Sequence, residues 1–545
     1  MKTLPIGKSD FKEIIEYNSY YLDKTLLIEE LLKENFKVQL FTRPRRFGKT
    51  LNMSMLKYFF DIENAEENKK LFKSLAIEKS EYFKEQGQYP VVFISFKDLE
   101  ANNWEEMIIR IKNLLSEVFS NYKHLVKGLD EFDLPIFKKI INEELDISNL
   151  KSVLRFLTKI LYEKYDKKVV LLIDEYDKPI ISAYEHGYYN KAISFFKSFY
   201  SLTLKDNSYL RTGVMTGILQ VAKEGIFSGL NNLMVHNILE NRYTTYFGLT
   251  EEEVKNTLTD YDLKENISDV KKWYNGYKFG NSEIYNPWSI LNYLYGKELK
   301  AYWINTSSNE LIYEALEKSE EDVFNELREL FEDKSIQKTI NASFNFQDIR
   351  NLRGIWQLFV YSGYLKIDES LGNNIYSLKI PNYEVKSFFE ESFINHFLGN
   401  QDSFREMLIG LKKKDIREFE RKLQQVFKLS ISYNDIGKEE KYYHNLLLGM
   451  ILAMQNEYNI DSNREDGYGR YDIFIEPKNK LDTGFILEFK VAESEEELEK
   501  KSLEAIEQVK EKEYFTSMKN NGIKDILVLG IAFYKKKIKV SYEKI

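Results

Sequence analysis

The chain has 545 residues, of which 43% are hydrophobic and 30% are charged, a balance typical of a globular protein with roughly three to four domains. It contains no cysteine, which excludes disulfides, cysteine-ligated zinc, iron–sulfur clusters and thiol nucleophiles. A formal net charge of -8 excludes a general electrostatic attraction to nucleic acid, so any such contact must use local basic patches.

The amino-terminal residues 1–8 lack the apolar core of a signal peptide. Further along the chain, no apolar run approaches the ~18 residues that a membrane span needs. We therefore expect a cytoplasmic protein that makes no contact with a membrane.

The segment 42–50, TRPRRFGKT, is the first pattern that carries chemistry. Residues 38–41, VQLF, predict a short strand before it. A helix is predicted after it from the apolar residues on one face, Leu51, Met55 and Phe59. A strand, a glycine-containing loop and a helix in this order are typical of a P-loop, in which backbone N–H groups and the helix N-terminus hold phosphates.

Lys49 and Thr50 fit the two side-chain roles of a P-loop. The lysine would reach the β and γ phosphates of ATP, and the threonine hydroxyl would ligate Mg²⁺. Gly48 would let the phosphates approach closely, and Arg46 and Phe47 complete the expected cofactor-binding loop.

Residues 169–175, VVLLIDE, predict a second part of the nucleotide site. The continuous apolar run indicates a strand buried on both faces, and this strand ends in two acids. This is the Walker B arrangement, in which Asp174 would hold Mg²⁺ through water and Glu175 would polarise the attacking water. The alternative is an ordinary buried strand with a polar end. A further predicted strand, 214–216, places Thr216 beside the γ-phosphate position as a polar sensor.

The region from about 250 to 330 reads as short helices and turns. Thr250, followed three residues later by Glu253, predicts a helix cap. The aromatic turn 273–277 is expected to pack a small helical lid or a winged-helix-like module, and stacking on bases is the alternative. Two more helices are predicted further along, at 355–365 and 383–397.

Two predicted strands near the carboxyl end, 470–475 and 484–491, carry a candidate nuclease site. Asp472 lies on the first strand, and Glu488 and Lys490 share one face of the second because strand side chains alternate. The two carboxylates would bind Mg²⁺ or Mn²⁺ beside a phosphodiester, and the lysine would orient the attacking water. The alternative is a solvated ion pair, although charge in an apolar strand is costly without a partner or a metal.

A helix precedes these two strands, and a second helix and a third strand follow them. The first helix is predicted at 440–455. The second is predicted to begin at a capping box at 494–497 and to run up to 514, and the third strand is predicted at 526–533.

This order of elements, with Asp472, Glu488 and Lys490 in it, resembles the core of the PD-(D/E)xK nuclease superfamily. The resemblance implies that these three residues form a catalytic triad. It also implies that Glu440 is an accessory acid and that Gln508 is a polar residue of the same site. The chain departs from the superfamily's usual proline before the first acid, where it has a tyrosine.

Four segments of the amino-terminal half together resemble the bacterial AAA-ATPase-like family: YLDKT at 21–25, RPRRFGKT at 43–50, LIDEYDKP at 172–179 and FSGLNN at 227–232. The matching continues through 273–277, 285–289 and 302–306. The resemblance implies an ATP-binding domain, and members commonly carry a carboxy-terminal PD-(D/E)xK domain. Arg43, at the place of the first P-loop glycine, is then a family trait. Gln220 stands where many relatives have arginine, and turnover is expected to be slow if that arginine senses phosphate.

We therefore predict an α/β multidomain protein. Its parts are a P-loop NTPase parallel-sheet domain at 1–245, a helical lid or linker region at 246–400 and a PD-(D/E)xK-type α/β domain at 401–545. The expected function is ATP binding and hydrolysis that controls a Mg²⁺-dependent nuclease, with defence against mobile DNA as the setting that similar architectures imply. DNA is favoured over RNA as the substrate, and assembly into a homo-oligomer is left open.

Two alternatives come from other classes of protein. One is a nucleotide-dependent switch whose nuclease-like domain is catalytically inactive and only binds, which Gln220 supports. The other is an enzyme that acts on a different phosphate ester.

Overall fold

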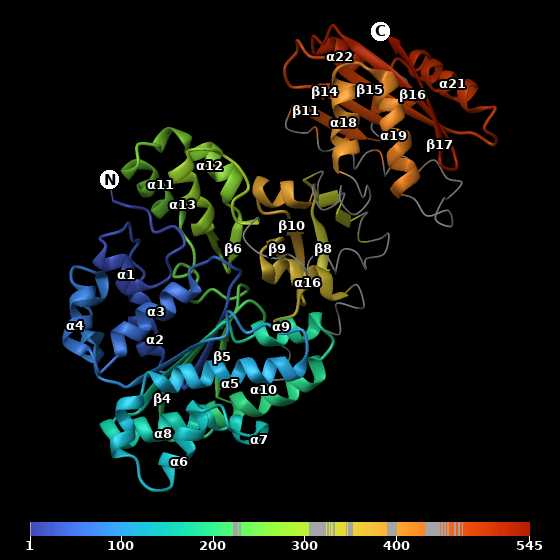
Figure 1. Ribbon diagram of the computed structural model, residues 1–545. Helices are drawn as coiled ribbons and strands as arrows, with labels where there is room; N and C mark the ends of the chain where they lie inside the picture. The colour runs from blue at the N-terminus through green and yellow to red at the C-terminus, as the bar shows by residue number, and fades with distance from the viewer. Residues whose placement is uncertain are drawn as a thin grey trace. The chain divides into compact units, whose positions relative to one another are not determined.

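The computed structural model divides into two compact units, Met1–Lys386 and Ser387–Ile545, and each is described by itself (Figure 1). The structure describes residues 2–221, 232–304, 333–344, 353–389, 401–430, 457–462 and 472–545, together with some single residues and short stretches between these ranges. Every helix in this part of the chain is too short or too polar to cross a lipid bilayer. The predicted domain boundaries at 245/246 and 400/401 stay predictions.

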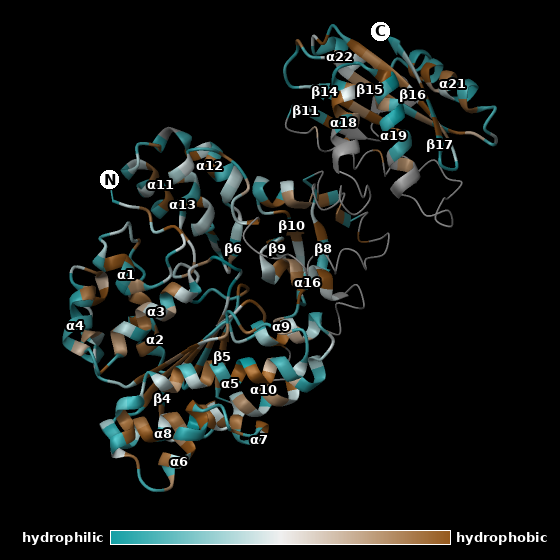
Figure 2. Cartoon of the chain, in the orientation of Figure 1, coloured by the Kyte–Doolittle hydropathy of each residue, from teal (hydrophilic) through white to brown (hydrophobic). Residues whose placement is uncertain are grey.

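A five-stranded parallel sheet forms the centre of the first unit, in the order β2-β3-β4-β1-β5. The strands are β1 (Val38–Thr42), β2 (Val91–Ser95), β3 (Val169–Asp174), β4 (Leu210–Gly217) and β5 (Leu233–His236). Every residue of β1 and β3 is buried, and Figure 2 shows this sheet as largely hydrophobic. The strands predicted from continuous apolar runs are confirmed, because a parallel sheet is covered on both faces.

Helices connect these strands by crossovers on both faces of the sheet. The chain moves from β1 to β2 in one direction and from β2 through β3 to β4 in the other. Because such crossovers are right-handed, α3 lies on one face and α5, α8 and α10 lie on the opposite face (Figure 1). The α-helices of this part are α1 (Phe11–Glu16), α2 (Leu26–Glu34), α3 (Lys49–Phe60), α4 (Ala65–Lys69), α5 (Trp104–Ser120), α6 (Asp133–Ile141), α7 (Ile147–Leu150), α8 (Val153–Tyr165), α9 (Lys178–Glu185) and α10 (Tyr189–Leu204).

The carboxyl ends of the central strands meet at one edge of the sheet. Thr42 at the end of β1 pairs in register with Gly217 at the end of β4, and Asp174 ends β3 on the other side of β4. Strand β4 thus lies between the strand that enters the predicted P-loop and the strand that ends at the two acids. This edge is where open parallel sheets bind ligands.

The rest of the first unit combines helices with two small antiparallel sheets. The helices and strands are α11 (Glu251–Asp260), α12 (Ile267–Tyr274), β6 (Tyr277–Phe279), β7 (Ser282–Ile284), α13 (Pro287–Gly296), β8 (Ile336–Thr339), α16 (Arg353–Ser362), β9 (Lys366–Gly372) and β10 (Ile375–Lys379). The Thr250 capping box is present, and the buried Tyr274 and Tyr277 confirm that the aromatic turn packs a core. The sheet β8-β10-β9 was not predicted, because exposed polar residues in β9 and β8 hide the strand pattern.

A mixed five-stranded sheet, in the order β11-β14-β15-β16-β17, forms the second unit. Strands β15 and β16 are parallel, and the other pairs are antiparallel. The main strands are β11 (Tyr458–Ser462), β14 (Ile473–Pro477), β15 (Gly484–Val491), β16 (Ile526–Tyr534) and β17 (Lys537–Lys544). Two short strands, β12 (Glu465–Asp466) and β13 (Gly469–Arg470), pair with each other.

Helices of the second unit cover both faces of this sheet. They are α18 (Gln401–Lys412), α19 (Ile416–Ser430), α21 (Leu498–Glu511) and α22 (Thr516–Asn520). The Phe427 ring of α19 stacks on Phe533, whereas α21 lies against Gly530. Because strand side chains alternate, these two positions of β16 face opposite sides, so α19 and α21 lie on opposite faces.

Two local predictions in this unit are wrong. Asp472 lies one residue before β14 rather than on the strand. Helix α21 begins at Leu498 with no side-chain hydrogen bond at its cap, so the capping box at 494–497 is absent. Instead Glu497 accepts a hydrogen bond from the backbone N–H of Glu493 within the preceding turn, at 3.2 Å. The helix predicted at 440–455, which includes Glu440, lies almost entirely outside the described residues.

Candidate functional site

The loop between β1 and α3 has the backbone shape of a phosphate-binding turn. Gly48 has φ of 82° and Arg46 has φ of 66°, both in the left-handed region that favours glycine. The Lys49 side chain is buried, and its Nζ atom donates to the backbone oxygens of Arg43 and Pro44 at 3.0 and 2.8 Å. The ammonium group therefore lies inside the loop, where the phosphates of a nucleotide would be held.

Arg43 anchors the start of this loop to the end of β5. Its guanidinium is fully buried and donates to the backbone oxygens of Thr42 and His236 at 2.8 and 2.7 Å. It also lies over the rings of Phe247 and Phe279, and burial lowers the pKa of Arg43 to about 9. The arginine at the place of the first glycine is thus a structural tie behind the loop.

Thr50, Asp174 and Thr216 meet at the carboxyl edge of the sheet. The Thr50 hydroxyl donates to Asp174 Oδ2 at 2.8 Å, and the Thr216 hydroxyl donates to Oδ1 of the same carboxylate. Asp174 is fully buried. A hydroxyl and a carboxylate at hydrogen-bonding distance are the hard oxygen ligands that fit Mg²⁺, so the residues present suit this ion.

Glu175 follows this carboxylate with φ of 54°, and its backbone N–H faces the Thr216 hydroxyl at 3.4 Å. Burial raises the pKa of Glu175, and the nearby Lys49 ammonium opposes that rise. Burial likewise lowers the pKa of Lys49, which the charge of Glu175 opposes. The two charged groups therefore lie within electrostatic reach of each other at the mouth of the loop.

Arg46 and Phe47 point in different directions. The Phe47 side chain is fully buried and packs on the rings of Tyr277 and Phe279, at 5.0 and 5.2 Å between centroids. Arg46 is exposed, with its guanidinium 4.3 Å from the centre of the Trp288 ring. Phe47 can therefore offer a ligand its backbone, and its side chain fixes the loop to the middle region.

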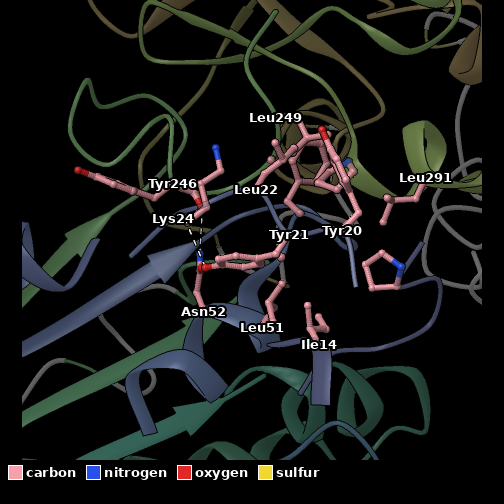
Figure 3. Close-up of a pocket in the computed structure, with 15 residues that line it drawn as sticks. Ile14, Tyr20, Tyr21, Leu22, Lys24, Leu51, Asn52, Tyr246, Leu249 and Leu291 are labelled. Atoms are coloured by element: carbon pink, nitrogen blue, oxygen red, sulfur yellow. Dashed lines mark hydrogen bonds between the residues drawn. The ribbon is translucent and has the colours of Figure 1, made fainter. Parts of the chain in front are cut away.

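A largely apolar cavity of about 100 Å³ lies beside the P-loop (Figure 3). Gly48 and Leu51 form part of its wall, and Tyr21, Leu22 and Leu249 contribute from other elements. The other lining residues are Pro5, Ile14, Tyr20, Lys24, Phe47, Asn52, Tyr246, Gly248, Pro287 and Leu291. Apart from Phe47 and Gly48 of the predicted phosphate loop, no role in binding was assigned to these residues from the sequence, although YLDKT at 21–25 was part of the family resemblance.

The segment after β4 is held by Asp177, which lies two residues after Glu175. Asp177 is buried, and its Oδ2 atom accepts from the backbone N–H groups of Ile218 and Leu219, both at 2.8 Å. The backbone oxygen of Gln220 then accepts from the N–H of Phe344 at 2.7 Å. The Gln220 Oε1 atom is buried without a hydrogen-bond partner among the described residues.

In the second unit, Asp472 and Glu488 lie side by side. The backbone N–H of Phe489 donates to Asp472 Oδ2 at 2.8 Å, and the N–H of Asp472 faces Glu488 Oε2 at 3.3 Å. Glu488 is 3% exposed, and Lys490 follows it on the same face of β15. Gln508 of α21 donates from Nε2 to Glu488 Oε1. The structure therefore brings Asp472, Glu488 and Gln508 together and places Lys490 on the strand face of Glu488, and Glu440 lies outside the described part of the chain.

The acid pair suits a divalent ion that keeps much of its water. Among the described residues, no group of three or more His, Cys, Asp or Glu side chains is arranged to hold a metal. Asp472 and Glu488 supply two carboxylates, and Mg²⁺ is commonly held by one or two carboxylates with several waters. This donor set is consistent with Mg²⁺ or Mn²⁺.

Gly530 allows α21 to bring Gln508 to the acid pair. A Cβ atom at this position would lie 2.0 Å from the backbone oxygen of Ser502. We expect Gly530→Ala to destabilise the second unit by about 3 kcal/mol, because overpacking at a backbone contact must move the helix. Thermal unfolding checks this, with Gly128→Ala as the control because a Cβ there has nothing within 4 Å. Equal melting temperatures for both variants would contradict the close packing.

Comparisons with known proteins agree with this division of the chain. Residues 5–227 match the family model described as a predicted AAA-ATPase, and residues 438–543 match that of the PD-(D/E)XK nuclease superfamily. The chain is also 26% identical over 552 residues to an uncharacterized protein in the vnfD 5' region of Azotobacter chroococcum mcd 1, covering 98% of this chain and 96% of that protein. The sequence-based family resemblance and the α/β multidomain fold are confirmed. Residues 5–227 are thus similar to predicted AAA-ATPase domains, and residues 438–543 are similar to domains of the PD-(D/E)XK nuclease superfamily.

Proposed function

We propose that the first unit binds and hydrolyses ATP with Mg²⁺, and that it thereby controls a Mg²⁺-dependent nuclease in the second unit. DNA is the favoured substrate, the cytoplasm is the expected location, and defence against mobile DNA is the proposed setting. The observation that carries the proposal is that Asp472, Glu488 and Gln508 lie together, because two acids at one place supply the carboxylate oxygens that Mg²⁺ prefers.

The nucleotide part of the proposal rests on the contacts around the P-loop. Lys49 would exchange its backbone partners in the loop for the β and γ phosphates, and Thr50 and Asp174 would hold Mg²⁺. Thr216 would keep the Asp174 carboxylate oriented, and the backbone of 46–48 would contact phosphate oxygens. The cavity beside Gly48 is apolar and lined by aromatic rings, which suits the flat base of ATP.

In the nuclease part, the residues divide the work of phosphodiester hydrolysis. Asp472 and Glu488 would hold the divalent ion, which when bound polarises the phosphoryl group and lowers the pKa of water. Lys490 would orient the attacking water and offset negative charge that develops in the transition state. Gln508 would fix the Glu488 carboxylate through its Nε2 hydrogen bond.

The experiment that tests the function is incubation of the purified chain with linear, circular and single-stranded DNA and with RNA. Each substrate is tested with and without Mg²⁺ or Mn²⁺, and with and without ATP. We expect cleavage of DNA that requires the divalent ion and whose rate changes with ATP. Hydrolysis of ATP with every nucleic acid left intact would overturn the nuclease proposal and point to another phosphate ester.

A second candidate is a nucleotide-dependent switch whose nuclease-like domain binds without cutting. Gln220 favours it, because an amide replaces the charge of the arginine that many relatives have, and its Oε1 atom is buried without a described partner. In that case ATP would bind tightly and turn over slowly. Substitution of Asp472 or Glu488 would then leave nucleic acid levels unchanged.

We expect Glu175→Gln to keep ATP binding and to lower the rate of ATP hydrolysis by about 10²-fold or more, since the amide cannot act as a general base. Because burial raises the pKa of Glu175, the wild-type rate should fall on the acid side at a higher pH than an exposed glutamate would give. Steady-state phosphate release measured from about pH 5 to about pH 8 tests both effects.

Glu163→Gln is the matched control, since this glutamate of α8 has a half-exposed side chain and forms only a loose ion pair with Lys159, at 3.8 Å. It should behave as the wild type. A Glu175→Gln enzyme with wild-type turnover would remove this residue from the hydrolytic site.

A further inference from the structure

Glu384 is a buried carboxylate that neither candidate site uses. It lies in the helical segment 383–389 and is fully buried. Its Oε2 atom accepts from the Ser289 hydroxyl at 2.8 Å, and its Oε1 atom accepts from the backbone N–H groups of Tyr302 and Trp303, both at 2.6 Å. Burial raises the pKa of Glu384 to about 7. A buried carboxyl group with three donors fixes the positions of the segments that supply them.

Both segments held by Glu384 end on the P-loop. The Trp303 indole N–H donates to the backbone oxygen of Arg45 at 3.1 Å, and Trp303 is itself buried. Ser289 lies in the first turn of α13 next to Trp288, whose ring carries the Arg46 guanidinium at 4.3 Å. One carboxylate therefore supports two neighbouring residues of the loop that would bind phosphate.

The Glu384 segment is also where the chain leaves the first unit, because the division between units falls between residues 386 and 387. Its start is tied to the same region, since Asn382 donates to the backbone oxygen of Asn275 at 2.8 Å and accepts from the N–H of Val385 at 3.0 Å. If the P-loop moves when a nucleotide binds, Trp303 and Glu384 would move with it, because hydrogen bonds connect them to the loop. The movement would then reach the segment that enters the second unit.

We propose that Glu384 is a positioning residue that links nucleotide occupancy of the P-loop to the segment leading into the second unit, and so makes nucleic acid cleavage depend on ATP. This inference rests on the proposed function, and it adds the route of control. Two sets of contacts connect the carboxylate to the loop, one through Trp303 and one through Ser289 and Trp288.

Glu384→Ala and Glu384→Gln test this route as a pair. Alanine leaves the N–H groups of Tyr302 and Trp303 without their acceptor, whereas the glutamine Oε1 can accept both and its amide can donate to the Ser289 hydroxyl. We expect ATP to change the wild-type cleavage rate by about fivefold or more, within the usual range of coupling between sites. The alanine variant should lose this response, and the glutamine variant should keep it.

Asn207→Ala is the control for lost stability, because Asn207 is equally buried and donates to Thr158 and to the backbone of Thr203, far along the chain from the P-loop. It should lower the melting temperature and keep the ATP response. Trp303→Phe removes the hydrogen bond to Arg45 and keeps an aromatic ring, so it tests the same route if Glu384→Ala does not fold. It should weaken the response.

The measurements are the cleavage rate of DNA with and without ATP, and the affinity for a fluorescent ATP analogue. Retention of the full ATP response in Glu384→Ala, or in Trp303→Phe, would overturn the inference while leaving the proposed function standing. A wild-type protein that cleaves DNA at the same rate with and without ATP would instead overturn the coupling itself, and this inference with it.

Discussion

Asp472→Ala and Glu488→Ala should each reduce nucleic acid cleavage by about 10³-fold or more, because either change removes a ligand of the divalent ion that supplies several kcal/mol of transition-state stabilisation. The Asp472 backbone N–H faces the Glu488 carboxylate at 3.3 Å, and Glu488 is buried. Loss of one acid therefore leaves a single carboxylate, which holds Mg²⁺ weakly. Gel-based cleavage of linear DNA across a series of Mg²⁺ and Mn²⁺ concentrations measures the effect.

Glu476→Gln is the matched control for this pair. Glu476 is a partly exposed acid on β14, and it accepts from the Asn521 side chain at 2.7 Å. Its substitution should leave cleavage unchanged. If Asp472→Ala cleaves like the wild type, the acid pair is not the nuclease site. If the wild type and every variant bind nucleic acid equally and none cleaves it, the switch is favoured.

Lys49→Ala should weaken ATP binding by about 100-fold or more, since loss of one partner of a buried charge pair costs about 2–5 kcal/mol. The Lys49 ammonium is buried inside the loop, next to Glu175 and Asp174. No other group is expected to replace it at the β and γ phosphates. Titration with a fluorescent ATP analogue in the presence of Mg²⁺ measures the affinity, and DNA cleavage by the same variant shows whether ATP gates cutting.

Lys57→Ala provides the comparison on the same helix. Lys57 lies two turns after Lys49 in α3, and its Nζ atom is 5.2 Å from the centre of the Tyr58 ring rather than in the loop. This change should leave ATP affinity within a factor of about two, as for other surface substitutions. Equal affinities of Lys49→Ala and the wild type would exclude the P-loop as the nucleotide site.

Corrections to the sequence-based predictions fall where the local pattern was weak. Strand β9 carries mostly exposed and polar residues, so neither period 2 nor an apolar run marked it. The capping box at 494–497 has the right residues, but the chain makes a turn there first and the helix begins at Leu498. Helix and strand ends depend on such competing hydrogen bonds, which the residue order alone does not decide.

The sequence by itself determined the elements whose signals lie close together along the chain. Strand β1 is followed within a few residues of sequence by Gly48, Lys49 and Thr50, and the apolar run of β3 ends directly at Asp174. Glu488 and Lys490 share a face because they are two residues apart on one strand. Period, spacing and residue type are enough for such predictions, because each depends on a few consecutive residues.

Only the tertiary structure decided which distant side chains meet. Thr216 and Gln508 were expected at the two sites, but their hydrogen bonds to Asp174 and Glu488 follow from strand register and helix crossovers. The same holds for the inward turn of Arg43 and for the burial of Glu384 against Trp303. Residues far apart in the chain come into contact only when whole faces pack, and the free energy of that packing is shared by the entire core.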